Sequence, residues 1–373
     1  MAALQIQERT TIRKIDYNLA LVVFALNLIG LINLYSATHG PSSARGSGNL
    51  FWYQIIYLIV GWLVYTGVTF IDYRFFLRIA YPLYFINCLF LLLVLIIGKA
   101  SLGAQRWFDL GFFHYQPSET MKLVMVLVVA RYFHTHVRPQ GHQLRELILP
   151  SLLVLVPTLF VIKQPDLGTG MLLVAAIATM FLFVKIQTRV LVATALIIVI
   201  ALPIAWKFGF KEYQKNRILT FLDPNRDPRG AGYNSIQSKI AVGSGKLFGK
   251  GFRKGTQGQL EFLPERHTDF IFSVLSEEHG FVGSVTTLSL FGLLFLMGVR
   301  IASQAKDKFG VLLVVGIMSI LFWHMFINVG MTTGLLPIVG IPLPLISYGG
   351  SSLLTTMLSL GIVSSISLRR FLF

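Results

Sequence analysis

Long apolar runs dominate the pattern of this chain. Ten segments each approach the roughly 20 apolar residues that a helix needs to cross a bilayer. The apolar residues stand in unbroken runs and do not alternate with polar ones, which argues against a transmembrane β-barrel. We therefore predict an all-α membrane protein, a polytopic bundle of ten transmembrane helices forming one domain over residues 1–373. The predicted spans are 17–37, 51–71, 79–98, 118–134, 145–163, 168–184, 188–207, 280–301, 308–330 and 347–368.

Composition narrows the class of protein further. Only 13% of the 373 residues are charged and 54% are hydrophobic, whereas a soluble domain carries about 25% charged residues. So few charges cannot cover a water-facing surface of this size, which excludes an ordinary soluble enzyme and a disordered chain. The single cysteine, Cys88, excludes a disulfide framework.

The net charge of +16 is unevenly distributed. Short loops on one side of the predicted membrane hold many more basic residues than the loops opposite, and such an excess marks the cytoplasmic side. Both termini are therefore predicted to be cytoplasmic. The richer side holds Arg9, Arg13, Lys14, Arg74, Arg78, Arg131, Arg138, Arg145, Lys185, Arg189, Arg300, Lys306, Lys308, Arg369 and Arg370, and the other holds Arg45, Lys99, Arg106 and Lys163.

One long loop, residues 208–267, joins the seventh and eighth spans on the extracytoplasmic side. Loops of this length in a compact protein are usually functional or disordered. Amphipathic pieces such as YNSIQSKIAV (233–242) favour an ordered loop that is partly embedded at the interface. The nearby GSGKLFGKG (243–251) looks like a phosphate-binding loop, but its spacing fits neither common glycine motif.

Ionisable residues inside spans are costly and suggest function. Glu119 and Lys122 are three residues apart and share one helix face. They could serve the chemistry, or form a local ion pair that offsets its own burial. Arg106, in the aromatic loop before them, is suited to meeting the phosphate of a membrane lipid, although a plain surface arginine explains it equally well.

Acidic residues cluster where the long loop meets the eighth span. Glu261, Glu265 and Asp269 recur every four residues and would share a face of a continuous helix, although Pro264 argues for a break. His267 lies between them. Asp269 directly precedes the apolar run FIFSVL, so it is either a functional carboxylate at the membrane boundary or a first-turn acid that favours the helix dipole.

The sequence gives little support for a metal site or for nucleic-acid binding. His134, His136 and His142 cluster in a cytoplasmic loop without cysteine, so solvated surface is the better interpretation and no metal site is predicted. Nucleic-acid binding is not expected, because the basic residues that topology leaves unexplained lie on the extracytoplasmic face.

Four long motifs resemble the SEDS family (shape, elongation, division, sporulation). They are QPSE…K at 116–122, GAGYNSIQSKIAVGSGKLFGKG at 230–251, LPERHTDFIFSVLSEEHG at 263–280 and PLPLISYGGSS at 342–352. The match covers nearly the whole chain from the first span, and it is closer to the elongation members than to the division members.

The resemblance implies a peptidoglycan glycosyltransferase for cell elongation. Such enzymes polymerise lipid II on the outer face of the bacterial inner membrane, beside a class B penicillin-binding protein that cross-links the product. The family's essential acid corresponds to Asp269, its second loop acid to Glu261, and its polar groups in the fourth helix to Glu119 and Lys122.

The residues are consistent with that chemistry. A pyrophosphate leaving group needs its charge neutralised, which Lys122, Arg106 and Arg217 could do, while Asp269 takes the proton from the acceptor hydroxyl. Glu265 and His267 are expected beside the substrate. No motif requires a cofactor, although Mg²⁺ or Mn²⁺ held by Glu119 or Glu261 would share the role of these cations.

Two alternatives from another class stay open. A flippase for lipid-linked precursors would use the same ion pair and the same cations, and a secondary transporter would also explain charges within spans. Both leave the acid cluster without a task.

Overall fold

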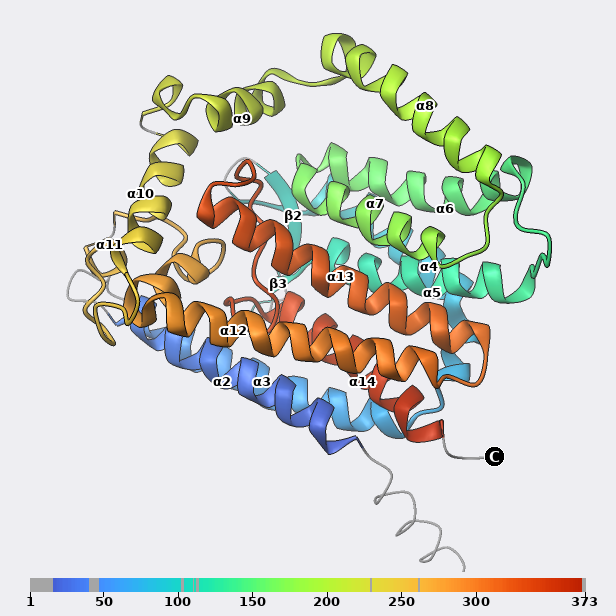
Figure 1. Ribbon diagram of the computed structural model, residues 1–373, viewed down its shortest axis with the longest axis horizontal. Helices are drawn as coiled ribbons and strands as arrows, with labels where there is room; N and C mark the ends of the chain where they lie inside the picture. The colour runs from blue at the N-terminus through green and yellow to red at the C-terminus, as the bar shows by residue number, and fades with distance from the viewer. Residues whose placement is uncertain are drawn as a thin grey trace, which may run out of the picture.

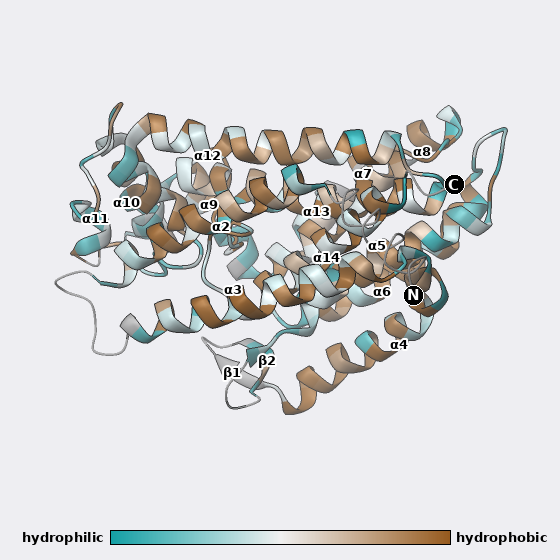
Figure 2. Cartoon of the chain, turned by 90° about the horizontal axis from the view of Figure 1, so that it is seen from below, coloured by the Kyte–Doolittle hydropathy of each residue, from teal (hydrophilic) through white to brown (hydrophobic). Residues whose placement is uncertain are grey.

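The computed structural model describes most of the chain. The described residues are 16–39, 47–101, 104–109, 111, 114–228, 230–260 and 262–370. Helices run side by side through the body of the molecule, with apolar residues along their shafts and polar residues gathered toward both ends (Figures 1 and 2). The chain is thus a helical bundle, as its hydropathy predicts.

Each predicted span overlaps one long helix. The ten helices are α2 (Tyr17–Thr38), α3 (Ser47–Phe70), α4 (Tyr73–Ile97), α5 (Pro117–Thr135), α6 (Leu144–Lys163), α7 (Leu167–Leu182), α8 (Thr188–Ile204), α12 (Ile271–Ser303), α13 (Lys308–Thr333) and α14 (Gly350–Arg369). Within the described residues, seven of these are long and apolar enough to cross a membrane, namely α2, α3, α4, α6, α12, α13 and α14. This establishes a polytopic membrane protein.

The centre of the bundle is α13, which packs against α5, α7, α12 and α14. Its neighbour α5 is buried on almost every side, from Pro117 to Ala130 with the exception of Thr120. A helix surrounded in this way has to satisfy its charges internally, because neither water nor lipid headgroups can reach them. The two charges in the first half of α5, Glu119 and Lys122, are therefore held within protein.

Short elements occupy the connections. The long segment after α8 contains a π-helical turn (Ala205–Gly209), α9 (Glu212–Leu222), a 3₁₀ turn (Pro224–Arg226), α10 (Ala231–Ser244) and α11 (Thr256–Gln259). The amphipathic piece 233–242 indeed lies within a helix. Between α4 and α5, the strands β1 (Lys99–Ser101), β2 (Ala104–Asp109) and β3 (His114–Tyr115) form a small antiparallel sheet that the all-α prediction did not include.

The predicted eighth span started too late. Helix α12 begins at Ile271 and is interrupted at Gly280, which has a φ of 66°. Loop 245–251 fills the break: the amides of Phe281 and Val282 donate to the carbonyls of Lys246 and Leu247 at 2.8 and 3.1 Å. A side chain on Gly249 would collide with the Glu278 carbonyl. The glycines of GSGKLFGKG therefore permit close backbone approach to α12.

Candidate functional site

Asp269 lies in a turn directly before α12, at the end of the bundle that carries α10 and α11. The residues before it adopt turns, and Glu265 has a positive φ of 51°. A continuous helical face for the acid cluster is therefore absent among the described residues, in line with the break expected at Pro264. Glu261, the second acid of that cluster, lies outside the described residues.

Three hydrogen bonds fix the backbone around Asp269. Asn328 Nδ2 donates to the Asp269 carbonyl at 2.8 Å, and Ser347 Oγ donates to the Thr268 carbonyl at 2.6 Å. The amide of Tyr348 donates to the His267 carbonyl at 2.9 Å. The cap position of α12 is Phe270 and no side chain caps it. Asp269 is thus held by α13 and by the segment before α14, and it does not serve as the helix cap.

The carboxylate of Asp269 is poised to exchange a proton. In the described part of the chain it makes no hydrogen bond and no ion pair, although it is half-buried. Burial raises its pKa to about 7, with a further rise from Glu265 and Asp166, against the lowering effect of Arg106 and Arg217. A carboxylate with such a pKa is suited to general base catalysis near neutral pH. The sequence left the direction of this shift open.

Arg106 reaches the same region from β2. Its Nε donates to the Gln164 carbonyl at 3.0 Å, and its Nη2 donates to the Pro165 carbonyl. Its Nη1 lies 3.8 Å from Asp166 Oδ2. Asp166 in turn caps α7, because its Oδ1 accepts from the Thr169 amide at 3.1 Å. Sequence analysis did not identify Asp166, although an aspartate just before an apolar run is a recognisable cap signal.

Arg217 comes from α9 and contacts the segment between α13 and α14. Its Nη1 donates to the Val339 carbonyl at 3.4 Å. The next residue, Gly340, has a φ of +73°, and a side chain there would start 3.1 Å from Asp269 Oδ2. The chain therefore brings Arg217 and Asp269 against the same short stretch of backbone.

Glu265 and His267 complete this group. Glu265 Oε2 accepts from Thr268 Oγ1 at 3.1 Å and lies 4.0 Å from His267 Nε2. Burial lowers the pKa of His267, although Glu265 opposes the change. The imidazole is thus favoured in its neutral form, beside the Tyr348 ring at a centroid distance of 6.0 Å.

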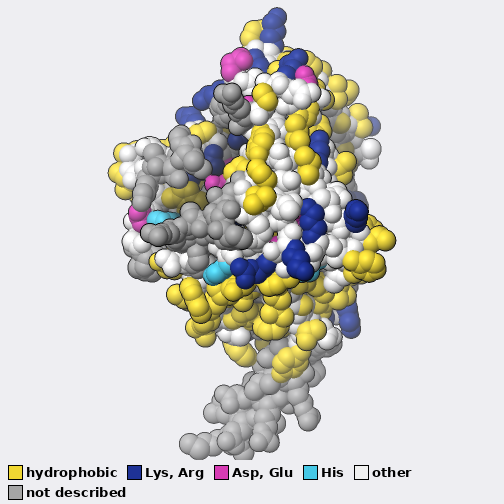
Figure 3. All heavy atoms as spheres, turned by 90° about the vertical axis from the view of Figure 1, so that its left-hand side faces the viewer, with side chains coloured by type: hydrophobic (Ala, Val, Ile, Leu, Met, Phe, Trp, Pro, Cys, Tyr) yellow, Lys and Arg dark blue, Asp and Glu magenta, His cyan; other side chains and the backbone are white. Residues whose placement is uncertain are grey.

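Cations surround this end of the molecule. Figure 3 shows Lys and Arg side chains gathered there beside a hydrophobic surface. Lys246, Arg253 and Lys254, in the segment between α10 and α11, are exposed. Such a surface attracts anionic ligands, including lipid phosphates.

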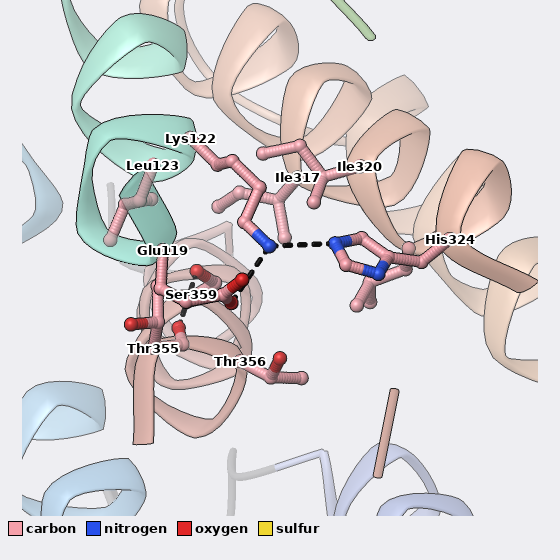
Figure 4. Close-up of a pocket in the computed structure, with 10 residues that line it drawn as sticks. Glu119, Lys122, Leu123, Ile317, Ile320, His324, Thr355, Thr356 and Ser359 are labelled. Carbon is pink, nitrogen blue, oxygen red and sulfur yellow. Dashed lines mark hydrogen bonds and ion pairs between the residues drawn. The ribbon is translucent and has the colours of Figure 1, made fainter. Parts of the chain in front are cut away.

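Glu119 and Lys122 form a separate site inside the bundle. Lys122 Nζ lies 2.7 Å from Glu119 Oε2 and 2.7 Å from His324 Nε2, so lysine bridges the other two (Figure 4). The three side chains line a cavity of about 10 Å³ with Thr355, Thr356 and Ser359, which is room for about one water molecule. The pair lies inside the bundle, while Leu123, Ile317, Ile320 and Leu321 complete the lining of the cavity, so the polar cavity expected around the pair stays a prediction. Sequence analysis missed His324, an ionisable residue within an apolar run.

Of the two acids considered as metal ligands, Glu119 lies among the described residues and Glu261 does not. No group of three or more His, Cys, Asp or Glu side chains in the described residues could hold one. Glu119, one of the two acids considered as a ligand, is engaged by Lys122. The residues around Asp269 include both acids and arginines, and the arginines can supply positive charge without a metal.

Known proteins resemble this chain over most of its length. A family model described as cell cycle protein, for FtsW, RodA and SpoVE, matches residues 17–371. The peptidoglycan glycosyltransferase MrdB of Escherichia coli (strain K12) is 48% identical over 291 residues, which is 78% of each chain.

Solved structures agree in fold. A chain from a peptidoglycan synthase complex that coordinates polymerization and crosslinking superposes with a TM-score of 0.82 at 32% identity, covering 96% of this chain and 99% of that one. The rod shape determining protein RodA of Thermus thermophilus gives a TM-score of 0.70 at 29% identity, covering 96% and 98%. The chain belongs to the SEDS family of FtsW, RodA and SpoVE, and within it is RodA-like.

Proposed function

We propose that this protein is a peptidoglycan glycosyltransferase that polymerises lipid II during cell elongation. The observation that carries the proposal is the half-buried carboxylate of Asp269, which has no partner within the described residues, has a pKa of about 7 and lies within the electrostatic influence of Arg106 and Arg217. The relative named above as a peptidoglycan glycosyltransferase supports the same reaction class.

In the proposed step, Asp269 takes the proton of the acceptor sugar hydroxyl. The hydroxyl oxygen then bonds to the anomeric carbon of the donor sugar, and the bond from that carbon to the pyrophosphate oxygen breaks. The pyrophosphate leaves with its electron pair, near Arg106 and Arg217, whose charges offset it. Glu265 and His267 would contact the sugars or their peptide. Contact of Glu119 and Lys122 with substrate stays a prediction, since their cavity would have to open.

The distribution of basic residues also suggests how the chain is oriented in the membrane. We propose that all ten long helices span it, with cytoplasmic termini and residues 208–267 on the extracytoplasmic side of the bacterial inner membrane. The basic loop residues support this orientation. A class B penicillin-binding protein is the proposed partner, supported by the similar chain from a complex that couples polymerization to crosslinking.

Asp269→Asn in the purified protein tests the reaction. The amide keeps the size of the side chain but cannot accept the proton, so glycan strands formed from lipid II should fall by about 10²-fold or more. Binding of lipid II should persist. Asp269→Glu is the matched control, since it retains a carboxylate and should keep measurable activity.

A lipid II flippase is the competing function. It would move lipid II across vesicle membranes, and the wild-type protein would form no glycan strands from purified lipid II. Full polymerase activity in Asp269→Asn would instead keep the reaction class but move the base to another acid, with Glu261 the first to test.

A further inference from the structure

Two residues of α13 hold consecutive carbonyls of the segment that faces Asp269. His324 Nδ1 lies 3.2 Å from the Pro342 carbonyl. One turn later, Asn328 Nδ2 donates to the Ile341 carbonyl at 2.7 Å and to the Asp269 carbonyl at 2.8 Å. Both side chains are buried, with 4% and 0% exposure. One face of α13 thus sets where segment 339–342 lies relative to Asp269.

The contacts of His324 define its protonation. The Lys122 ammonium carries only donors, so His324 Nε2, 2.7 Å away, must accept. The Pro342 carbonyl carries only an acceptor, so His324 Nδ1 must donate. A neutral imidazole with its hydrogen on Nδ1 satisfies both neighbours. The ring therefore joins the Glu119–Lys122 pair directly to the backbone of segment 339–342.

We propose that His324 is a positioning residue for the transfer reaction, through which the buried Glu119–Lys122 pair fixes segment 339–342 against Asp269. This rests on the proposed function. Two contacts make the segment important: Gly340 lies against the Asp269 carboxylate, and Val339 accepts the hydrogen bond of Arg217. A shift of the segment would displace the base and a cation together, and misplacement of reacting groups by about 1 Å can cost about 10²-fold in rate.

Two variants separate positioning from simple packing. His324→Leu fills the space but removes both hydrogen bonds, and should lower the maximal rate of lipid II polymerisation by about tenfold or more while the apparent KM changes less than about twofold. His324→Gln offers an amide oxygen to Lys122 and an amide hydrogen to Pro342, and should restore most of the rate. Ser319→Ala is the control, because Ser319 is buried on the same helix and its hydroxyl donates within that helix, to the Val315 carbonyl.

A spectroscopic measurement tests the hydrogen bonds that join Lys122, His324 and Pro342, and it does not depend on enzyme activity. In the ¹⁵N spectrum of the labelled protein, the signal that disappears in His324→Gln belongs to His324 and should be that of a neutral histidine with its hydrogen on Nδ1. That signal should change in Lys122→Met. The opposite tautomer, or a signal unmoved by Lys122→Met, would overturn the network.

The kinetic outcomes are equally decisive. An unchanged maximal rate in His324→Leu, or an effect on KM alone, refutes the positioning role while leaving the proposed function intact. A rate lost in both His324→Leu and His324→Gln, with normal thermal unfolding, also refutes it. A wild-type protein without polymerase activity refutes the proposed function instead, and the ¹⁵N spectrum still decides whether the network exists.

Discussion

The protein holds two groups of charges in opposite ways. Glu119 and Lys122 are almost fully buried and contact each other at 2.7 Å. Asp269 is half-buried and its carboxylate has no partner within the described residues. Buried charge is tolerated only when paired, whereas a base has to keep a free lone pair. The interior pair is arranged as buried charges that neutralise each other, whereas the carboxylate at the end of the bundle is arranged as the proposed general base requires.

The largest expected effect is a loss of stability on removing the charge of Lys122 inside the bundle. Lys122→Met leaves Glu119 buried without a counter-charge, which should lower the free energy of unfolding by about 3 kcal/mol or more. The double variant Glu119→Gln/Lys122→Met removes both charges and should recover much of that loss. Thermal or denaturant unfolding in detergent measures both. If the double variant were less stable than Lys122→Met alone, the charges would not act as a pair.

Removing the charge of Asp269 is expected to raise the stability of the folded protein, whereas removing the charge of Lys122 is expected to lower it. Its pKa is about 7 in the folded protein, against an ordinary value of 3.8. The folded state therefore binds this proton more tightly than the unfolded state does, and ionisation costs stability as pH rises from about 4 through about 7. Asp269→Asn should therefore be more stable than wild type at pH 8, by on the order of 1–2 kcal/mol, and nearly equal at pH 4.

Unfolding midpoints of wild type and Asp269→Asn at these two pH values check this expectation. Ser319→Ala serves as a control whose difference from wild type should not depend on pH, since serine does not titrate in this range. A variant that is destabilised equally at both pH values would mean that Asp269 has a structural role.

The long helices and the interior pair are the parts that sequence predicts well. Apolar runs report helices directly, and a spacing of three residues is enough to pair Glu119 with Lys122. The third member of that group, His324, is 202 residues away from Lys122. Spacing cannot reveal such a partner, although an ionisable residue inside an apolar run is by itself a signal.

The site around Asp269 is harder to predict, because tertiary packing assembles it from separate elements. Arg106 comes from β2, Asp166 from the start of α7 and Arg217 from α9, and local periodicity relates none of them to Asp269. The predicted eighth span began at residue 280, later than α12 does, for a related reason. Its first turns, before Gly280, contain Glu277 and Glu278, so hydropathy alone assigns them to the loop. Both acids are buried, and Glu277 is paired with Lys250 at 2.7 Å.

The smallest expected effect is the difference between substitutions of Arg106 and Arg217, the two arginines near Asp269. Arg106 contacts two carbonyls and Asp166, whereas within the described residues Arg217 makes one hydrogen bond, at 3.4 Å. Arg217 is thus freer to turn toward an anionic substrate. Arg217→Gln should raise the apparent KM for lipid II about fivefold, close to 1 kcal/mol, because an ion pair that is partly open to water contributes little more. Arg217→Lys keeps the charge and should stay within about twofold of wild type. Arg106→Gln should in addition lower thermal stability, because it removes the hydrogen bonds to the Gln164 and Pro165 carbonyls just before α7. Polymerisation rates over a range of lipid II concentrations, with unfolding midpoints for all three variants, measure the difference. Equal losses of stability in Arg217→Gln and Arg106→Gln would show that both arginines serve the fold and that the pyrophosphate is bound elsewhere.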